Sequence, residues 1–211
     1  MREVEAEFPS ANIDVEQAAE YLSQRLSLPV KPHGLTHSRD IFVDTVNFEL
    51  LKRGFTFRLR QKLDNIYSGE GTRLTFKYPL EEMPDFLVRE ELKMKTSVRE
   101  FGEVIEFLSG MSFAIFKEPA QITLAVEETS REFDLGAPGR KLRVAYDAVK
   151  FKDPADAKRA HSVNYLEIED HGVGMDVLMQ AKAAVEEYYS LSPSTEGKYR
   201  FGLKALSLAP K

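Results

Sequence analysis

The sequence contains no cysteine and no long apolar run. The absence of cysteine excludes disulfide bonds, thiolate metal sites and cysteine nucleophiles. Because no stretch of about 18 apolar residues exists, no segment predicts a helix that crosses a membrane. The first residues, Met1-Arg2-Glu3-Val4-Glu5, also lack the apolar stretch of a secretory signal. We therefore expect a cytoplasmic protein that has no membrane partner.

The sequence also lacks an excess of positive charge. Its 29 basic residues are outnumbered by 34 acidic ones, which gives a formal net charge of −5. Proteins that bind nucleic acids usually carry a basic excess or a basic stripe. The composition therefore argues against a nucleic-acid partner, and the informative question is where the charged side chains point.

The chain shows no sign of internal division. It has no repeat of fixed period, no low-complexity tract and no Gly/Ser linker, so we predict a single domain over residues 1–211. Asp14 and Gln17, and likewise Ser97 and Glu100, have the spacing of a helix capping box. Apolar residues at helical spacing predict four helices, at residues 14–27, 97–108, 175–189 and 196–206.

Most of the remaining chain predicts strands, because β-branched, aromatic or alternating residues are bounded by Gly, Pro or Asp. Gly136-Ala137-Pro138-Gly139 is a hairpin signal. His33 and His37 flank Gly34 and are interpreted as part of a loop without a metal. The predicted strands cover residues 3–8, 39–44, 55–61, 72–78, 87–94, 122–134, 142–151 and 164–170. Many strands with few helices predict an α+β protein built on an antiparallel sheet.

Charged residues share one face of nearly every predicted strand, since alternate side chains of a strand point to opposite sides. The simplest interpretation is an amphipathic sheet whose charged face lies in water. However, several of these faces carry charges of one sign only, and like charges repel unless a ligand or a neighbouring strand compensates them. The residues on these faces are Glu3, Glu5 and Glu7; Arg58 and Arg60; Arg73, Thr75 and Lys77; Arg89, Glu91 and Lys93; Arg143 and Asp147; and Glu167 and Glu169.

A closed antiparallel β-barrel of about eight strands accommodates both faces. The apolar faces would pack against helices on the outside, and the charged faces would line a tunnel. Clustered carboxylates suit a hard cation such as Mg²⁺ or Mn²⁺, and clustered Arg and Lys suit phosphate oxygens. The combination predicts a site for a metal–polyphosphate complex. The pairs Glu81-Glu82 and Glu127-Glu128 are interpreted as solvated.

A series of short motifs follows the predicted strands. They are Glu3-Val4-Glu5-Ala6-Glu7-Phe8, Ile41-Phe42-Val43-Asp44-Thr45, Phe57-Arg58-Leu59-Arg60, Leu74-Thr75-Phe76-Lys77, Val88-Arg89-Glu90-Glu91, Tyr146-Asp147-Ala148-Val149, Tyr165-Leu166-Glu167-Ile168-Glu169 and Gly197-Lys198-Tyr199. In this order they resemble the ExExK, YFDT, LRxR, LTxK, RxE, LDxV, ExE and SKY motifs of the triphosphate tunnel metalloenzymes, the CYTH-like superfamily. The resemblance spans nearly the whole chain. It implies a triphosphate tunnel and divalent-metal chemistry on inorganic triphosphate, thiamine triphosphate or ATP.

The resemblance also implies a role for each matching residue. Asp147 would support the metal or orient water, and Glu91 would share the inner face with the phosphate-binding groups. Arg131 and Arg143 are further candidates for residues that face the tunnel. The metal, Mg²⁺ or Mn²⁺, would be held by Glu3, Glu5, Glu167 and Glu169. The phosphate oxygens would be bound by Arg58, Arg60, Lys77, Arg89 and Lys198.

Three positions depart from the family pattern. Glu7 replaces the lysine of the first motif, Lys93 stands where a second acid is expected after Glu91, and Gly197 replaces a serine. Glu7 and Lys93 both fall on the predicted inner face. We therefore hypothesise that the two charges have been exchanged and that these side chains pair across the tunnel.

The expected activity is metal-dependent hydrolysis of inorganic triphosphate or of an organic triphosphate, such as thiamine triphosphate or a nucleotide. Three alternatives stay open: a non-catalytic module that binds polyphosphate or a nucleotide, an adenylyl cyclase, and an amphipathic sheet without a ligand. The expected partner is this small-molecule substrate. A homodimer stays open beside a monomer.

Overall fold

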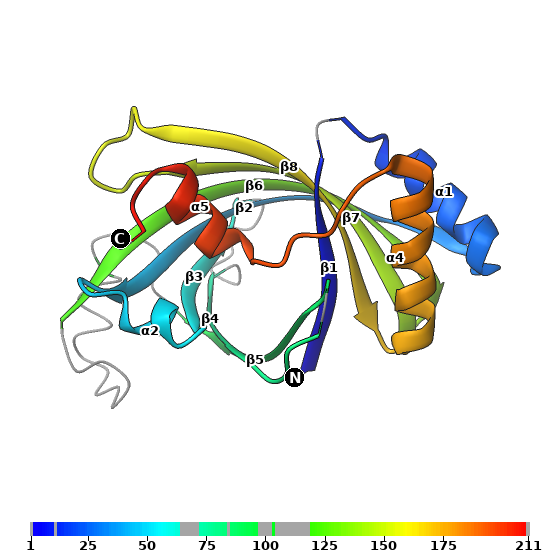
Figure 1. The fold of residues 1–211 in the computed structure, drawn as a ribbon, viewed down its shortest axis with the longest axis horizontal. Coiled ribbons are helices and arrows are strands. Elements are labelled where there is room, and N and C mark those ends of the chain that lie inside the picture. The colour runs from blue at the N-terminus through cyan, green and yellow to red at the C-terminus, as the bar shows by residue number, and fades with distance from the viewer. Residues whose placement is uncertain are drawn as a thin grey trace.

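Antiparallel strands close into a barrel in the computed structural model of the protein, which describes residues 2–10, 12–63, 72–83, 85–96, 103 and 119–209 (Figure 1). The order around the barrel is β1-β5-β4-β3-β2-β6-β7-β8, and β8 pairs with β1 to close it. The predicted closed antiparallel barrel is confirmed. The strands are β1 (Arg2–Ser10), β2 (Val30–Thr45), β3 (Thr56–Lys62), β4 (Thr72–Pro79), β5 (Leu87–Lys95), β6 (Ala120–Ala137), β7 (Arg140–Lys152) and β8 (Ala160–His171).

Strand β2 is longer than the sequence predicts. It begins at Val30 and runs through His33 and His37, so the loop expected around these histidines is wrong. Pro32 and Gly34 lie at a register shift against β6. An irregularity of this kind tolerates both a residue without an N–H and a glycine, which is why neither residue ends the strand.

The hairpin between β6 and β7 forms where the sequence predicts it. Gly136 has a φ of 122° and pairs with Lys141. A Cβ atom at Gly136 would lie 2.6 Å from the carbonyl oxygen of Arg140, so a side chain has no room there. The glycine is therefore required both for its backbone conformation and for the close approach of the two strands.

Two helices cover one part of the outer surface of the barrel. Helix α1 (Val15–Leu26) and helix α4 (Met175–Tyr189) lie side by side against β1, β7 and β8 (Figure 1). The Asp14 carboxylate accepts hydrogen bonds from the backbone N–H groups of Glu16 and Gln17, which fixes the start of α1. These two helices confirm the predictions for residues 14–27 and 175–189. The helix predicted at residues 97–108 lies outside the described residues except for Glu103, which is helical.

Helix α5 (Lys198–Ala205) packs into one end of the barrel interior. It corresponds to the helix predicted at residues 196–206, but it does not pack on the outside as expected. Its residues Tyr199 and Leu203 pack against inner-face side chains of β2, β6, β7 and β8, and the rings of Tyr199 and Phe42 stack at 4.8 Å. The apolar inner-face residues in this cluster are Phe42, Leu124, Val126, Val149, Phe151 and Tyr165. At this end the side of the tunnel formed by β2, β6, β7 and β8 is therefore filled with apolar side chains.

A short helix, α2 (Glu49–Lys52), was not predicted from the sequence. The Asp44 carboxylate, which is fully buried, accepts hydrogen bonds from the backbone N–H groups of Leu50 and Leu51. The Tyr199 hydroxyl lies 3.4 Å from the same carboxylate. Asp44, in the motif that resembles YFDT, therefore has a structural role that links α2 to α5.

Gly202→Ala should displace α5 from the barrel. A Cβ atom at Gly202 would lie 2.4 Å from Cδ1 of Phe151 and 2.8 Å from Cδ2 of Leu124, and both side chains are fully buried. We expect a loss of about 1–3 kcal/mol in the free energy of unfolding, measured by urea denaturation. Gly139→Ala is the comparison for backbone strain without overpacking, because a Cβ there meets nothing within 4 Å but the φ of 78° disfavours alanine. Equal stability of Gly202→Ala and the native protein would mean that α5 is not held as described.

No helix in the described part of the chain is both long enough and apolar enough to cross a membrane.

Candidate functional site

The tunnel is lined at one height by a ring of charged side chains, one from each strand. Strands tilt in a closed barrel, so residues of neighbouring strands at one height are diagonal rather than direct partners. The pairing registers place each member of the ring diagonal to the next. We call these residues the charged ring: Glu5, Arg89, Lys77, Arg58, Asp40, Glu128, Asp147 and Glu167.

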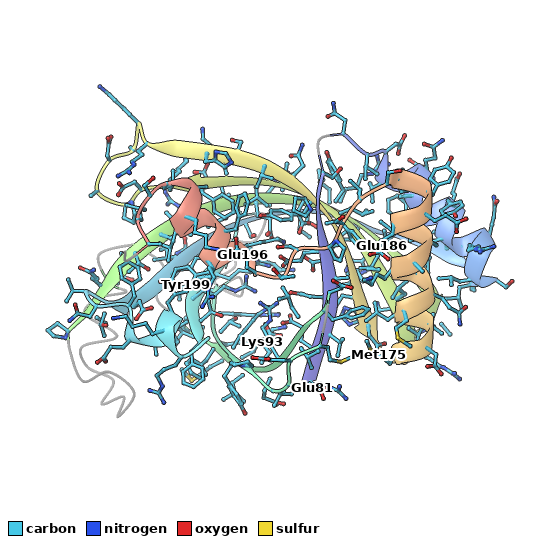
Figure 2. All side chains as sticks on the ribbon, viewed as in Figure 1. Glu81, Lys93, Met175, Glu186, Glu196 and Tyr199 are labelled. Atoms are coloured by element: carbon cyan, nitrogen blue, oxygen red, sulfur yellow. The ribbon has the colours of Figure 1, made fainter. Side chains whose placement is uncertain are left out.

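The two ends of the tunnel differ. At one end, the layer next to the ring contains apolar side chains of β2, β6 and β8 that contact α5. They include Phe42, Val126 and Tyr165, each two residues along its strand from the ring member. Toward the other end lie further polar and charged side chains, among them Lys62, Arg73 and Lys93, which line the cavity. The cavity has a volume of about 1040 Å³. Figure 2 labels Lys93 of β5 between the ribbons of β1 and β4, and Tyr199 of α5. The cavity also reaches the α5 end, where Phe55, Pro79 and Leu87 line it. We call the end that carries the cations the open end.

The cations of β3 are organised by a buried acid of β2. Asp40, only 2% exposed, accepts two hydrogen bonds of 2.7 Å from the Arg60 guanidinium and one of 2.9 Å from Nη1 of Arg58. Arg60 also donates to Glu128 at 2.8 Å. Nε of Arg58 is buried and has no hydrogen-bond partner among the described residues. Arg58 thus lines the cavity with a donor to spare.

The cations of β4 and β5 are shared with the acids of β1. Nζ of Lys77 lies 2.7 Å from Glu3, and Arg89 donates to both Glu3 and Glu5. Burial opposes ionisation of Glu3, but Lys77 and Arg89 outweigh it and lower the pKa of this carboxyl. Burial likewise opposes the charge of Arg89, but its acidic neighbours raise the pKa of the guanidinium. Arg89 therefore keeps its charge inside the tunnel.

Lys198 enters the ring from the first residue of α5. Its ammonium group lies 2.5 Å from Asp147, 3.0 Å from Glu167 and 3.2 Å from Glu128. Burial raises the pKa of Asp147 to about 7. The charges of Glu128 and Glu167 also raise this pKa, and the charge of Lys198 lowers it. Oδ1 of Asp147 has no hydrogen-bond partner in the described part of the chain. Asp147 therefore presents a free oxygen atom that can exchange a proton near neutral pH.

Three carboxylates lie close enough together to hold a metal ion. One oxygen each of Glu5, Glu7 and Glu167 can be chosen so that all lie within 4.8 Å of one another. Burial raises the pKa of Glu5 and of Glu7, and nearby carboxylates add to the effect. Oxygen donors of this kind fit a hard divalent cation. Of the carboxylates that the resemblance assigns to metal, Glu5 and Glu167 are in this group.

The other two assigned carboxylates have different partners. Glu3 is engaged by Lys77 and Arg89, as described above. Glu169 lies in the layer next to the charged ring, toward the open end, with its carboxylate 2.9 Å from Nε2 of His171. The structure therefore brings all four acids to one side of the tunnel but groups only two of them.

Two expectations about charged residues are wrong. Arg131 does not face the tunnel: it is exposed on the outside and forms a 2.7 Å ion pair with Glu16 of α1. The alternation of β6 explains this, because Glu128, Ser130 and Glu132 take the inner face. For the same reason Glu128 is not solvated but 8% exposed within the ring. Glu127, on the outer face, pairs with Lys152 as an ordinary surface residue.

The expected pair between Glu7 and Lys93 does not form. Lys93 lies on the inner face as predicted, but its ammonium group pairs with Glu91 of the same strand. The spacing of two residues on β5 makes this partner nearer than an acid across the tunnel. Glu7 instead belongs to the three-carboxylate group and lies one layer nearer α5 than the ring.

Arg143 lies at the open end of the tunnel, on the inner face as expected. Its guanidinium group is 3.2 Å from Glu132 and 3.0 Å from Asp134. His33 approaches the same two acids, with Nδ1 at 3.1 Å from Asp134. Arg143 is thus engaged in a network at the rim, apart from the ring.

Two members of the ring were missed in the sequence. Asp40 stands alone between Arg39 and Ile41, and its strand carries Phe42 on the same face, so the one-sided charge pattern is absent there. Glu128 directly follows Glu127, so the alternation of charged and apolar residues is not visible at this position. Counting back in steps of two from Glu132 along β6 would have placed Glu128 on the inner face, once the tunnel-facing side of this strand was known.

The chain was compared with known proteins. A family model described as the CYTH domain matches residues 1–198. No curated protein matches the sequence.

Several solved structures share the fold. The PH1819 protein from Pyrococcus horikoshii OT3 aligns with a TM-score of 0.58 and 15% identity over 96% of this chain and 98% of its own. The PH1012 protein of the same organism aligns with a TM-score of 0.55 and 12% identity over 99% of both chains. HpAC1 from Hippeastrum, whose structure is described as revealing a dominant triphosphatase activity, aligns with a TM-score of 0.56 and 13% identity over 96% of this chain and 95% of its own. At these identities the likeness shows the fold alone.

Proposed function

Since this chain belongs to the CYTH domain family, we propose that it is a divalent-metal-dependent phosphohydrolase that acts on inorganic triphosphate or on an organic triphosphate bound inside the tunnel. The observation that carries the proposal is the charged ring. It joins three cations, Arg58, Lys77 and Arg89, and a group of carboxylates around one cavity. A solvated sheet face would not bury these groups or orient them toward a common space.

The cations would bind the phosphate oxygens. Arg58 has an unused donor in the cavity, and Asp40 holds its guanidinium group in place. Lys77 and Arg89 face the same space from the neighbouring strands. Guanidinium and ammonium donors placed in advance stabilise charge that develops on a phosphoryl group. Arg60 and Lys198, which the resemblance also assigns to phosphate, would act beside them.

The carboxylates would hold the metal. Glu5 and Glu167 fit this role because their oxygens lie within one group of three carboxylates. Glu3 and Glu169 flank this group. A divalent metal bound there would neutralise charge on the phosphate oxygens. The site thus has separate groups for the metal and for the phosphate chain: the carboxylates lie on β1 and β8, and the cations lie on the adjoining strands β5, β4 and β3.

Asp147 is the group best placed to take a proton from the attacking water. Its unpartnered Oδ1 is buried in the ring, and its pKa is raised to about 7. A general base works best when its pKa is close to the working pH. Lys198, at 2.5 Å, would hold the carboxylate in place and stay protonated. The proton would therefore move from water to Oδ1 of Asp147.

The substrate would enter from the open end. The apolar layer and α5 fill part of the other end, whereas Lys62, Arg73 and Lys93 line the approach from the open side. Cations along an approach route raise the rate at which an anion is captured. The group attached to an organic triphosphate would therefore lie toward this end.

The proposal is tested by incubating the protein with tripolyphosphate, thiamine triphosphate or ATP in the presence of Mg²⁺ or Mn²⁺. We expect orthophosphate from at least one of them, and no turnover after a chelator removes the metal. Cyclic AMP and pyrophosphate from ATP would support an adenylyl cyclase instead. If a triphosphate binds tightly but is not turned over under any of these conditions, the proposed enzymatic activity is rejected and a non-catalytic binding module is favoured.

A further inference from the structure

We propose that Glu7 is a metal ligand, and that with Glu5 and Glu167 it forms a site that binds a divalent cation in the absence of any phosphate compound. The inference deepens the proposed function, because the ion would be the one used in the same tunnel. It concerns the residue that departs most clearly from the family pattern, an acid in place of a lysine.

The first observation is the position of Glu7. It is the direct partner of Glu167 in the pairing of β1 with β8. Glu5 lies on the same face of β1, and oxygen atoms of the three carboxylates come within 4.8 Å of one another. Like charges directly opposite each other across two strands repel. A cation between these carboxylates would convert the repulsion into attraction.

The second observation is an unused oxygen. Glu7 is 3% exposed, and its Oε2 atom is buried without a hydrogen-bond partner among the residues that the structure describes. Buried polar atoms normally have a partner, and an exception calls for an explanation. A carboxylate oxygen in this state, next to two other carboxylates, is suited to a metal ion.

The third observation is that the neighbouring cations are already engaged. The cations whose charges act on Glu7 are Lys198, Arg89 and Lys77, and the carboxylate of Glu167 acts against them. An ammonium group has three N–H donors, and Lys198 lies within ion-pair distance of three other carboxylates, those of Glu128, Asp147 and Glu167. Arg89 bonds to Glu3 and Glu5, and Lys77 bonds to Glu3. This part of the tunnel therefore has more carboxylates than cations, and Glu7 is the one left over.

The third carboxylate changes what the site can do alone. Mg²⁺ in phosphate-processing sites is usually bound by one or two carboxylates plus oxygens of the substrate. Glu7 supplies one ligand that would otherwise come from the phosphate chain. The cation would then be resident in the protein, and the phosphate compound would bind to a site whose charge is already reduced.

The decisive experiment is a calorimetric titration of the metal-free protein with Mn²⁺ in a buffer without phosphate compounds. We expect one Mn²⁺ per chain, and an affinity at least about tenfold weaker in Glu7→Gln, since even indirect partners of a metal change its affinity by that factor. Glu132→Gln is the matched control: Glu132 also lines the cavity but pairs with Arg143 at the rim, so Mn²⁺ affinity should not change.

Thermal unfolding separates a metal ligand from a merely structural residue. Without metal, Glu7→Gln should unfold at a higher temperature than the native protein, because the repulsion with Glu167 is removed. With Mn²⁺, the native protein should gain more stability than the variant. A structural role for Glu7 would instead lower the unfolding temperature of the variant under both conditions.

Native Mn²⁺ affinity in Glu7→Gln, or no Mn²⁺ binding by the native protein until tripolyphosphate is added, would overturn the inference. These results are distinct from a failure of the proposed function. If the protein hydrolyses tripolyphosphate and Glu7→Gln has unchanged Mn²⁺ affinity, only the role of Glu7 as a metal ligand is rejected. If Mn²⁺ binds through Glu7 but no triphosphate is hydrolysed, only the proposed phosphohydrolase activity is rejected.

Discussion

Arg58→Gln is expected to lower kcat/KM for tripolyphosphate by about 10²–10³-fold, the loss typical when one donor to a developing anion is removed. Arg58 is the cation of the ring with a buried donor, Nε, that no described residue uses. Asp40 fixes the guanidinium group from behind at 2.9 Å. Glutamine keeps a polar side chain but loses both the charge and the fork of donors. Steady-state kinetics at saturating Mg²⁺ and calorimetric binding of tripolyphosphate measure the effect.

The matched control is Arg131→Gln. Arg131 was also expected in the tunnel from the sequence, but its side chain is 53% exposed and pairs with Glu16 outside the barrel. Its removal should leave kcat/KM unchanged within about twofold, because charges on the far side of the wall are screened by solvent. If the two variants lose activity equally, or if neither does, the ring is not the phosphate site.

The strands and their inner faces could be predicted because the information is local. In β1, Glu3, Glu5 and Glu7 alternate with apolar residues, and β3 shows the same pattern with Arg58 and Arg60. Alternation is a property of a single strand, so no knowledge of neighbours is needed. The motif series added the order of the strands along the chain.

The composition of the ring could not be predicted in the same way. Asp40 and Glu128 enter it because β2 and β6 lie between β3 and β7 in the closed barrel, which is a non-local fact. Their strands also carry Phe42 and Val126 on the inner face, for contact with α5. A face that is half charged and half apolar looks ordinary until the helix that fills one end of the tunnel is known.

Pair contacts were the least predictable feature. The proposed exchange between Glu7 and Lys93 failed because Lys93 has Glu91 on its own strand face. Lys198 reaches three acids only because α5 enters the end of the barrel and points its first residue at the ring. Such contacts depend on heights along the tunnel, which the barrel tilt and the strand registers decide together.

Asp40→Ala should lower the free energy of unfolding by about 3 kcal/mol, the lower part of the range for breaking a buried ion pair by removing one partner. Asp40 is 2% exposed and is the common acceptor for Arg58 and Arg60. Its loss leaves Arg58 without its ion-pair partner, while Arg60 keeps Glu128 at 2.8 Å, which limits the penalty. Urea unfolding followed by circular dichroism measures the change.

Glu16→Ala provides the comparison, since its 2.7 Å ion pair with Arg131 is as short but lies in solvent, with both side chains more than half exposed. Exposed pairs contribute about 1 kcal/mol or less, so this variant should unfold close to the native urea concentration. If Asp40→Ala does not fold, Asp40→Asn supplies the measurement, because the amide oxygen retains one acceptor of similar size. Equal stability of the Asp40 and Glu16 variants would show that the tunnel is as wet as the surface. In that case the cations of the tunnel would attract a phosphate chain no more strongly than cations on the outside of the barrel. Charges inside the tunnel interact strongly only if water is excluded from it.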